Sequence, residues 1–295
     1  MVATDFSDTA RYAVHWAASI AGAHGARLEI FHALQAPPVG AIPEVVPLPP
    51  SFYEHDRKEA ERLLQEAAAG LPGISAGTSL RSGTAASAIV DVAAECSADL
   101  LVVGVRGTSA LERVFLGSVA ARVVRDSPCP VLAVPSGLQG DHRPIRKVLL
   151  PTDFSNDAKR ALEAVSAVLG PAADGKKIRL LHVWSVPIAV GVAWPASGGI
   201  PDLRLFVDSA RKKLEEEASA LREAGYDVEA VEREGEPAQI IDEEAREMGA
   251  DAIAIGTHGR SGLRRLFLGS VAERVLPAAP CPVLTVRRVS EALDE

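Results

Sequence analysis

Aromatic residues are scarce in this 295-residue chain, at 4% of the total, and no stretch is rich in lysine and arginine. The formal net charge is −8, which divides about evenly between the two halves. Binding to nucleic acid regardless of sequence requires a basic surface, and binding to single strands also uses aromatic rings for base stacking. The composition therefore argues against a nucleic-acid partner.

Long hydrophobic runs are also missing. Uninterrupted aliphatic stretches such as LLVV at 100–103 are far shorter than the roughly 20 residues that cross a bilayer. The first residues, MVATDFSDTARY, include an acidic residue at position 5 and lack the apolar core of a signal peptide. We therefore expect a cytoplasmic protein with no membrane partner.

Cysteine is rare, with Cys96, Cys129 and Cys281 in no CxxC or metal-ligand spacing. Cys129 and Cys281 occupy equivalent places in two copies of the sequence PCPVL, so they need not meet in space. Reduced, buried thiols are the simplest interpretation.

What the chain does contain is a repeat of about 150 residues. The segment 104–124 shares 13 of 21 residues with 256–276, at an offset of 152. Further matches follow in the same order: ATDFSD with PTDFSN, LEIFHA with IRLLHV, and PCPVLAV with PCPVLTV. A unit of this length is a domain and not a solenoid module.

Each half alternates short Val/Ile/Leu runs with longer amphipathic runs, giving the order β-α-β-α-β-α-β-α-β. This order predicts an α/β fold: two tandem doubly wound, five-stranded parallel-sheet domains of Rossmann-like type, with helices on both faces. We assign residues 1–137 and 145–290 to the domains and the polar, glycine-rich residues 138–144 to the linker. Counterparts of residues 145–148 are lacking before Met1, so the first strand is expected to be clipped, either naturally or because the true start lies upstream.

A glycine pattern, G-x2-G-x9-G-S, follows the fourth predicted strand of each half. Its members are Gly104, Gly107, Gly117 and Ser118, and then Gly256, Gly259, Gly269 and Ser270. Loops at the carboxyl ends of strands bind ligands in open α/β sheets, and glycine lets backbone N–H groups converge on an anion at a helix start. The pattern indicates a phosphate cradle, although turns and helix caps also use glycine.

Two other recurrent pieces follow predicted strands. Asp5 and Asp153 end the first strand of each half, where a carboxylate could accept a ribose or base hydrogen bond, help to hold Mg²⁺, or cap the next helix. His32 and His182 end the second strand. Because neither histidine has a partner carboxylate at a recognisable spacing, we interpret both as structural, hydrogen-bonded residues and not as catalytic bases.

Taken together, TDFS, the histidine after the second strand, the glycine pattern and PCPVL resemble the universal stress protein family, and the resemblance covers both halves. It implies a tandem member whose halves each bind ATP with Mg²⁺. The adenosine contacts it implies are Ala3, Thr4, Asp5 and Ala33, and then Pro151, Thr152, Asp153 and Val183. The phosphate contacts it implies are Gly104, Arg106, Gly107, Gly117, Ser118 and Val119, and then Gly256, His258, Gly259, Gly269, Ser270 and Val271.

The resemblance also implies pairing through the fifth strands, VLAV and VLTV, as an intramolecular pseudo-dimer, and leaves further homodimer formation open. Its functional implication is a regulatory, nucleotide-binding protein of the stress response that is not an enzyme, with slow ATP hydrolysis left open. The glycine segment lacks the lysine of P-loop enzymes. The alternatives are an ATP-using nucleotidyl-transferase or ATP pyrophosphatase, whose HxGH and SGGxDS motifs are not found near the first strand, and a scaffold that has lost nucleotide binding.

Overall fold

The computed structural model describes residues 1–34, 50–105, 116–138, 144–169, 175–185, 203–257 and 268–286. The strands are β1 (Val2–Ala3), β2 (Leu28–Leu34), β3 (Ala76–Ser82), β4 (Leu101–Gly104), β5 (Val131–Val134), β6 (Lys147–Pro151), β7 (Lys177–Trp184), β8 (Asp227–Glu234), β9 (Ala252–Gly256) and β10 (Val283–Val286). The helices are α1 (Asp8–His24), α2 (Pro50–Ala69), α3 (Ala85–Glu95), α4 (Ser118–Asp126), α5 (Asn156–Leu169), α6 (Leu203–Glu223), α7 (Pro237–Met248) and α8 (Ser270–Ala278).

Each half forms a parallel five-stranded sheet, as the alternation of strands and helices predicts. The strand order is β3-β2-β1-β4-β5 in the first half and β8-β7-β6-β9-β10 in the second. Successive strands are therefore added first to one side of β1 and then, from β4 on, to its other side; the same change of side separates β6 from β9. These are the switch points at which open α/β sheets place their ligands.

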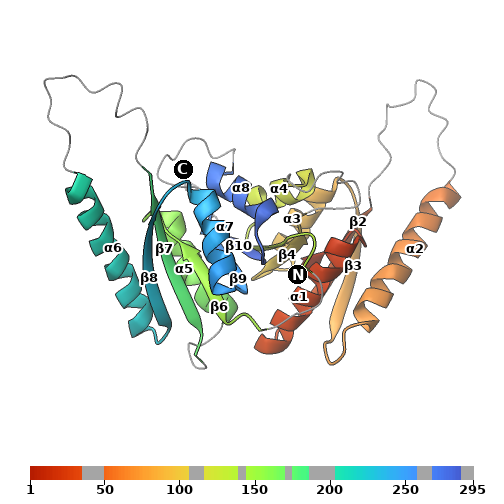
Figure 1. The fold of residues 1–295 in the computed structure, drawn as a ribbon. Coiled ribbons are helices and arrows are strands. Elements are labelled where there is room, and N and C mark those ends of the chain that lie inside the picture. The colour runs from red at the N-terminus through yellow and green to blue at the C-terminus, as the bar shows by residue number, and fades with distance from the viewer. Residues whose placement is uncertain are drawn as a thin grey trace, which may run out of the picture.

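The two five-stranded sheets are continuous with each other. Strand β10 pairs antiparallel with β5, with Leu284 opposite Leu132, so a single ten-stranded sheet runs through the molecule. The outermost strands, β3 and β8, are packed against α2 and α6, which lie at opposite ends of the sheet in Figure 1. One fold therefore contains two switch points, one on each side of a central antiparallel pair.

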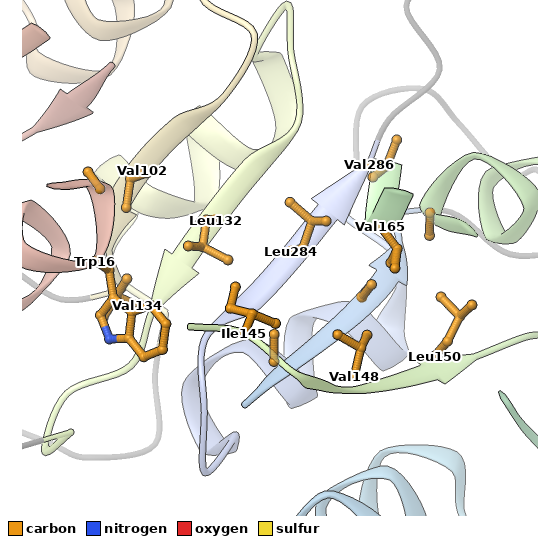
Figure 2. Packing of buried hydrophobic residues seen from close by; sticks show 14 of the residues in the cluster. Trp16, Val102, Leu132, Val134, Ile145, Val148, Leu150, Val165, Leu284 and Val286 are labelled. Atoms are coloured by element: carbon orange, nitrogen blue, oxygen red, sulfur yellow. The ribbon is translucent and has the colours of Figure 1, made fainter. Parts of the chain in front are cut away.

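Helices cover both faces of the sheet. The buried cluster on one face combines residues of α1, α2, α5 and α6, and the cluster on the other combines residues of α3, α4, α7 and α8. Both clusters include residues of both halves. Figure 2 shows part of the first cluster, with Leu132 and Val134 of β5 near Leu284 of β10, and Trp16 and Ile145 beside them. The core is thus continuous across the central pair.

The first strand of each half differs in length. Strand β1 covers two residues, whereas β6 covers five. In the second half the Asp251 carboxylate accepts the N–H groups of Arg146 and Lys147, at 2.9 and 2.8 Å, and so holds the start of β6.

Among the described helices, none combines the length and apolar character that crossing a bilayer requires.

Candidate functional site

The loops that follow β1 and β6 have the same backbone conformation. Each turns at a phenylalanine in the left-handed region, Phe6 with φ 63° and Phe154 with φ 62°. The preceding threonine stabilises the turn, because Thr4 Oγ1 and Thr152 Oγ1 each accept the phenylalanine N–H at 3.0 Å. A left-handed residue other than glycine costs about 1–2 kcal/mol, so strain of this kind suggests a functional loop.

The aspartate in each loop has a local structural role. Asp153 Oδ1 accepts the Ser155 N–H at 3.0 Å, and Ser155 Oγ accepts the Ala158 N–H at 3.3 Å. The first half repeats both bonds from Asp5 and Ser7, at 3.1 and 3.2 Å. The serine therefore caps the next helix, and the aspartate supports the turn before it. Capping of the next helix, one of the roles considered for this aspartate, thus belongs to the serine two residues later.

The histidines after the second strands are hydrogen-bonded to these loops. His182 Nδ1 lies 2.9 Å from the Thr152 carbonyl oxygen, and His32 Nδ1 lies 2.7 Å from that of Thr4. Each imidazole also stacks on the loop phenylalanine, with ring centroids 4.5 Å apart. His182 is buried and His32 is half-buried. These contacts confirm that both histidines are hydrogen-bonded, whereas their structural role stays an interpretation.

In each half, the described ends of the glycine pattern come together at the carboxyl ends of that half's strands. The Gly117 N–H donates to the Val105 carbonyl at 3.0 Å, and the Gly269 N–H donates to the Thr257 carbonyl at 2.8 Å. These glycines are the N-caps of α4 and α8 and make no side-chain cap hydrogen bond. Helices thus start beside the ends of β4 and β9. Arg106, Gly107, His258 and Gly259 lie outside the described residues.

Gly256 occupies a position that a larger residue could not fill. A Cβ atom there would lie 2.8 Å from the carbonyl carbon of Asp157 and 3.0 Å from the Ala158 nitrogen. Both are backbone atoms in the first turn of α5, so the helix itself would have to shift to make room. Glycine at this position therefore allows the end of β9 to approach the loop after β6.

A cavity of about 280 Å³ lies at this junction in the second half. Eight of the ten residues assigned to this half's site from the sequence line it: Pro151, Thr152, Asp153, Val183, Gly256, Gly269, Ser270 and Val271. The other two are His258 and Gly259. Residues from four separate segments thus meet around one cavity, at the switch point between β6 and β9.

Sequence analysis missed part of the wall of this cavity. The additional lining residues are Ser155, Ala158, Leu181, Pro237, Ile241, Ile255, Thr257 and Ala272. Pro237 and Ile241 come from the first turns of α7, where the sequence indicated only a helix. Ile241 is 2% exposed and is apolar, so nothing in its identity distinguishes it from a core residue.

The first half places its counterparts on the same framework. Ala3 ends β1, Thr4 and Asp5 follow it, Ala33 lies in β2, and Gly104 ends β4. Gly117, Ser118 and Val119 begin α4. The Thr4 N–H donates to the Phe31 carbonyl at 2.9 Å, and the Thr152 N–H donates to that of Leu181 at 2.8 Å. The two loops are thus attached to the second strand in the same way.

No three His, Cys, Asp or Glu side chains gather into a metal-binding group within the described part of the chain. Mg²⁺ in proteins is commonly held by one or two carboxylates together with phosphates, so it does not require such a group.

Known proteins resemble the chain along its whole length. The model of the universal stress protein family matches residues 1–135 and 144–287. A universal stress protein of Mycolicibacterium smegmatis is 30% identical over 298 residues, covering 97% of this chain and 96% of the relative. One of Mycobacterium tuberculosis is 30% identical over 305 residues, covering 97% and 95%. The crystal structure of a universal stress protein from Archaeoglobus fulgidus aligns with a TM-score of 0.69 at 22% identity, covering 98% and 96%, and so has a similar fold.

Proposed function

The chain belongs to the universal stress protein family, and on that premise we propose that each half binds an adenine nucleotide, with ATP as the ligand, in a regulatory protein of the stress response. The observation that carries this proposal is the cavity of the second half. It joins the strained loop after β6, the close approach at Gly256 and the start of α8.

The start of α8 supplies the phosphate end of the proposed site. Ser270, Val271 and Ala272 line the cavity and form the first turn of the helix, where backbone N–H groups have no acceptor within the helix. These N–H groups and the helix dipole favour an anion. Gly269 places this turn beside Thr257 without a side chain of its own in the way.

Other residues that line the cavity supply the adenosine end. Leu181, Ile241 and Ile255 form an apolar surface suited to an adenine ring, and Asp153 adds a carboxylate suited to a ribose hydroxyl. In the first half, Ala3, Asp5 and Ala33 are the proposed adenosine contacts, as Pro151, Asp153 and Val183 are in the second. Bound Mg²⁺ would neutralise charge on the phosphates, and Asp5 and Asp153 are the carboxylates that would contact it.

The arrangement favours binding over turnover. The Nδ1 atoms of His32 and His182 are engaged by loop carbonyls, which suits a structural role better than proton transfer. We therefore propose a protein whose shape or partner contacts respond to ATP occupancy, with any hydrolysis slow. A nucleotidyl-transferase or ATP pyrophosphatase would instead release pyrophosphate or AMP at each turnover.

The antiparallel β5–β10 pair supports a further part of the proposal, that the two halves act as an intramolecular pseudo-dimer. We also propose residues 1–137 and 145–290 as the functional domains. Cytoplasmic location, and assembly of two chains into a homodimer, stay predictions.

Isothermal titration calorimetry with Mg·ATP tests the proposed sites. Gly117→Val and Gly269→Val each add bulk where a helix begins beside a strand end, so each is expected to remove one of two binding events. The double variant is expected to bind no ATP. Gly70→Ala at the end of α2 is the control, because its Cβ would meet only ordinary contacts, the nearest at 3.4 Å.

Unchanged stoichiometry in a folded double variant would contradict this placement of the sites. Thermal unfolding gives a second measurement, since a ligand at a hundredfold excess over its dissociation constant stabilises the folded state by about 2.7 kcal/mol. Repeated release of AMP and pyrophosphate would favour the enzyme alternative. Absence of any thermal shift would favour a scaffold without nucleotide.

A further inference from the structure

The second site has a side-chain hydrogen bond whose acceptor residue has no equivalent acceptor in the first half. Thr152 Oγ1 accepts the Phe154 N–H at 3.0 Å and donates its own proton to Glu217 Oε2 at 2.9 Å. Glu217 lies on α6, 65 residues further along the chain. Because the hydroxyl proton of Thr152 points to this carboxylate, the lone pairs of Thr152 Oγ1 are left to face the Phe154 N–H.

The corresponding position of the first half is Leu63 of α2. Helices α2 and α6 bury the same positions along their length, since Ala60 and Leu64 match Leu214 and Ala218. Leu63 and Glu217 immediately precede the second residue of each pair, and both are half-buried. A leucine offers no acceptor to Thr4, so the first loop lacks this support.

The surroundings of Glu217 act on its carboxyl group in opposite directions. Burial raises the pKa of its carboxyl group, whereas the Thr152 hydrogen bond and the nearby Lys159 of α5 oppose that rise. The charged or titratable groups around it also include Asp153 of the loop and His182 of β7. A half-buried carboxylate makes a stronger hydrogen bond than an exposed one, because water competes less for it.

The loop that Glu217 supports is the one that carries Asp153 into the cavity. A loop already held in its binding conformation loses less freedom when a ligand binds, so holding it raises affinity without any new ligand contact. We propose that Glu217 is a positioning residue that fixes the Thr152–Phe154 turn and makes the second site the tighter of the two nucleotide sites. This inference rests on the proposed function.

Amide hydrogen exchange measured by NMR on the full chain tests the positioning step without nucleotide. The Phe154 N–H is expected to exchange about tenfold more slowly than the Phe6 N–H in the unaltered protein, because Glu217 holds the Thr152 hydroxyl that accepts it, whereas Thr4 has no such support. Glu217→Leu, which copies the first half, is expected to remove the difference. Glu217→Gln keeps an acceptor oxygen and is expected to retain most of it.

Two further variants separate this role from general packing. Glu216→Leu removes a charge at the neighbouring exposed position of α6 and is expected to leave the Phe154 N–H protected. Leu63→Glu supplies the missing acceptor in the first half and is expected to slow exchange at Phe6. Equal exchange at Phe154 in the parent and in a folded Glu217→Leu protein overturns the inference. If Glu217→Leu does not fold, unchanged exchange at Phe6 in Leu63→Glu overturns it.

Calorimetry in a Gly117→Val background isolates the second site. There, Glu217→Leu is expected to weaken ATP binding about tenfold, and Glu217→Gln much less. Equal affinities in the parent and Glu217→Leu overturn the inference alone, since ATP binding itself is then observed. Absence of ATP binding by the parent overturns the proposed function, and the affinity part of the inference with it.

Discussion

The two halves agree closely in the loops after β1 and β6 and differ in what packs behind them. Both loops have a left-handed phenylalanine, the same threonine and aspartate hydrogen bonds, and the same histidine contact. The helices that pack behind these loops, α2 and α6, carry different side chains there: Leu63 in the first half and Glu217 in the second. The backbone geometry of the loop therefore depends on a few local side chains, and the surrounding elements can change without altering it.

The clearest difference lies where α3 and α7 pack on the sheet. In the second half Glu244 is buried and bonds Arg179 at 2.8 Å and Arg233 at 2.6 Å. In the first half the equivalent of Glu244 is Val92, part of an apolar cluster. One domain thus fills this space with an ion network and the other with hydrocarbon, on the same fold.

The largest expected effect concerns the reactivity of the cysteines in the two PCPVL segments. Burial raises the pKa of the Cys281 thiol to about 12 and raises that of the half-buried Cys129 as well. Since the thiolate is the reactive form, alkylation of Cys281 at pH 8 is expected to be more than a hundredfold slower than that of the exposed Cys96, with Cys129 between them. Raising the pH toward 12 should accelerate the reaction at Cys281.

Mass spectrometry of iodoacetamide-treated protein measures these rates. Labelling in concentrated urea is the control, because unfolding should bring the three thiols to similar rates. Rapid labelling of Cys281 in the folded protein would show that the PCPVL segment of the second half opens, contrary to the buried arrangement.

Glu244→Val copies the first half into the second and sharpens the comparison of the two packing solutions. Arg179, whose side chain is 13% exposed, would lose its buried partner and keep the exposed Glu229 at 2.9 Å, so we expect a loss of about 2 kcal/mol in the free energy of unfolding. Glu247→Val is the matched control. Glu247 lies 3.6 Å from the same guanidinium but is exposed, so its loss is expected to cost under about 1 kcal/mol.

Urea unfolding followed by circular dichroism checks both values. A Glu244→Val protein as stable as the parent would mean that the ion network contributes no more than the hydrocarbon of the first half.

The starts of α3 and α7 give the smallest expected difference. Glu236 caps α7, accepting the Gln239 N–H at 3.0 Å, whereas Thr84 makes no side-chain cap hydrogen bond at α3. We expect Glu236→Ala to lower the free energy of unfolding by about 1 kcal/mol and Thr84→Ala by less than about 0.5 kcal/mol. The same urea experiment measures both, and equal effects would contradict the assigned caps.

Much of the fold and site was predictable from local patterns. A parallel sheet is predicted in each half by the apolar runs of β2, β4 and β5 and by the amphipathic helices between them. The repeat provides the same evidence a second time. Strand ends in such a sheet share one edge, so Thr152, Asp153 and Gly256 could be placed together before any coordinates. Ile241 could not, because an apolar residue in a helix looks the same whether it faces a cavity or the core.

The sequence by itself determined the repeat, the order of strands and the turns after β1 and β6, because these depend on residues within a few positions of one another. The resemblance implied that the fifth strands pair, but only the tertiary structure decided their antiparallel register, with Leu284 opposite Leu132, and that Glu217 bonds Thr152 while Leu63 takes its place in the first half. Contacts between residues so distant along the chain depend on how whole elements pack, which no local periodicity records.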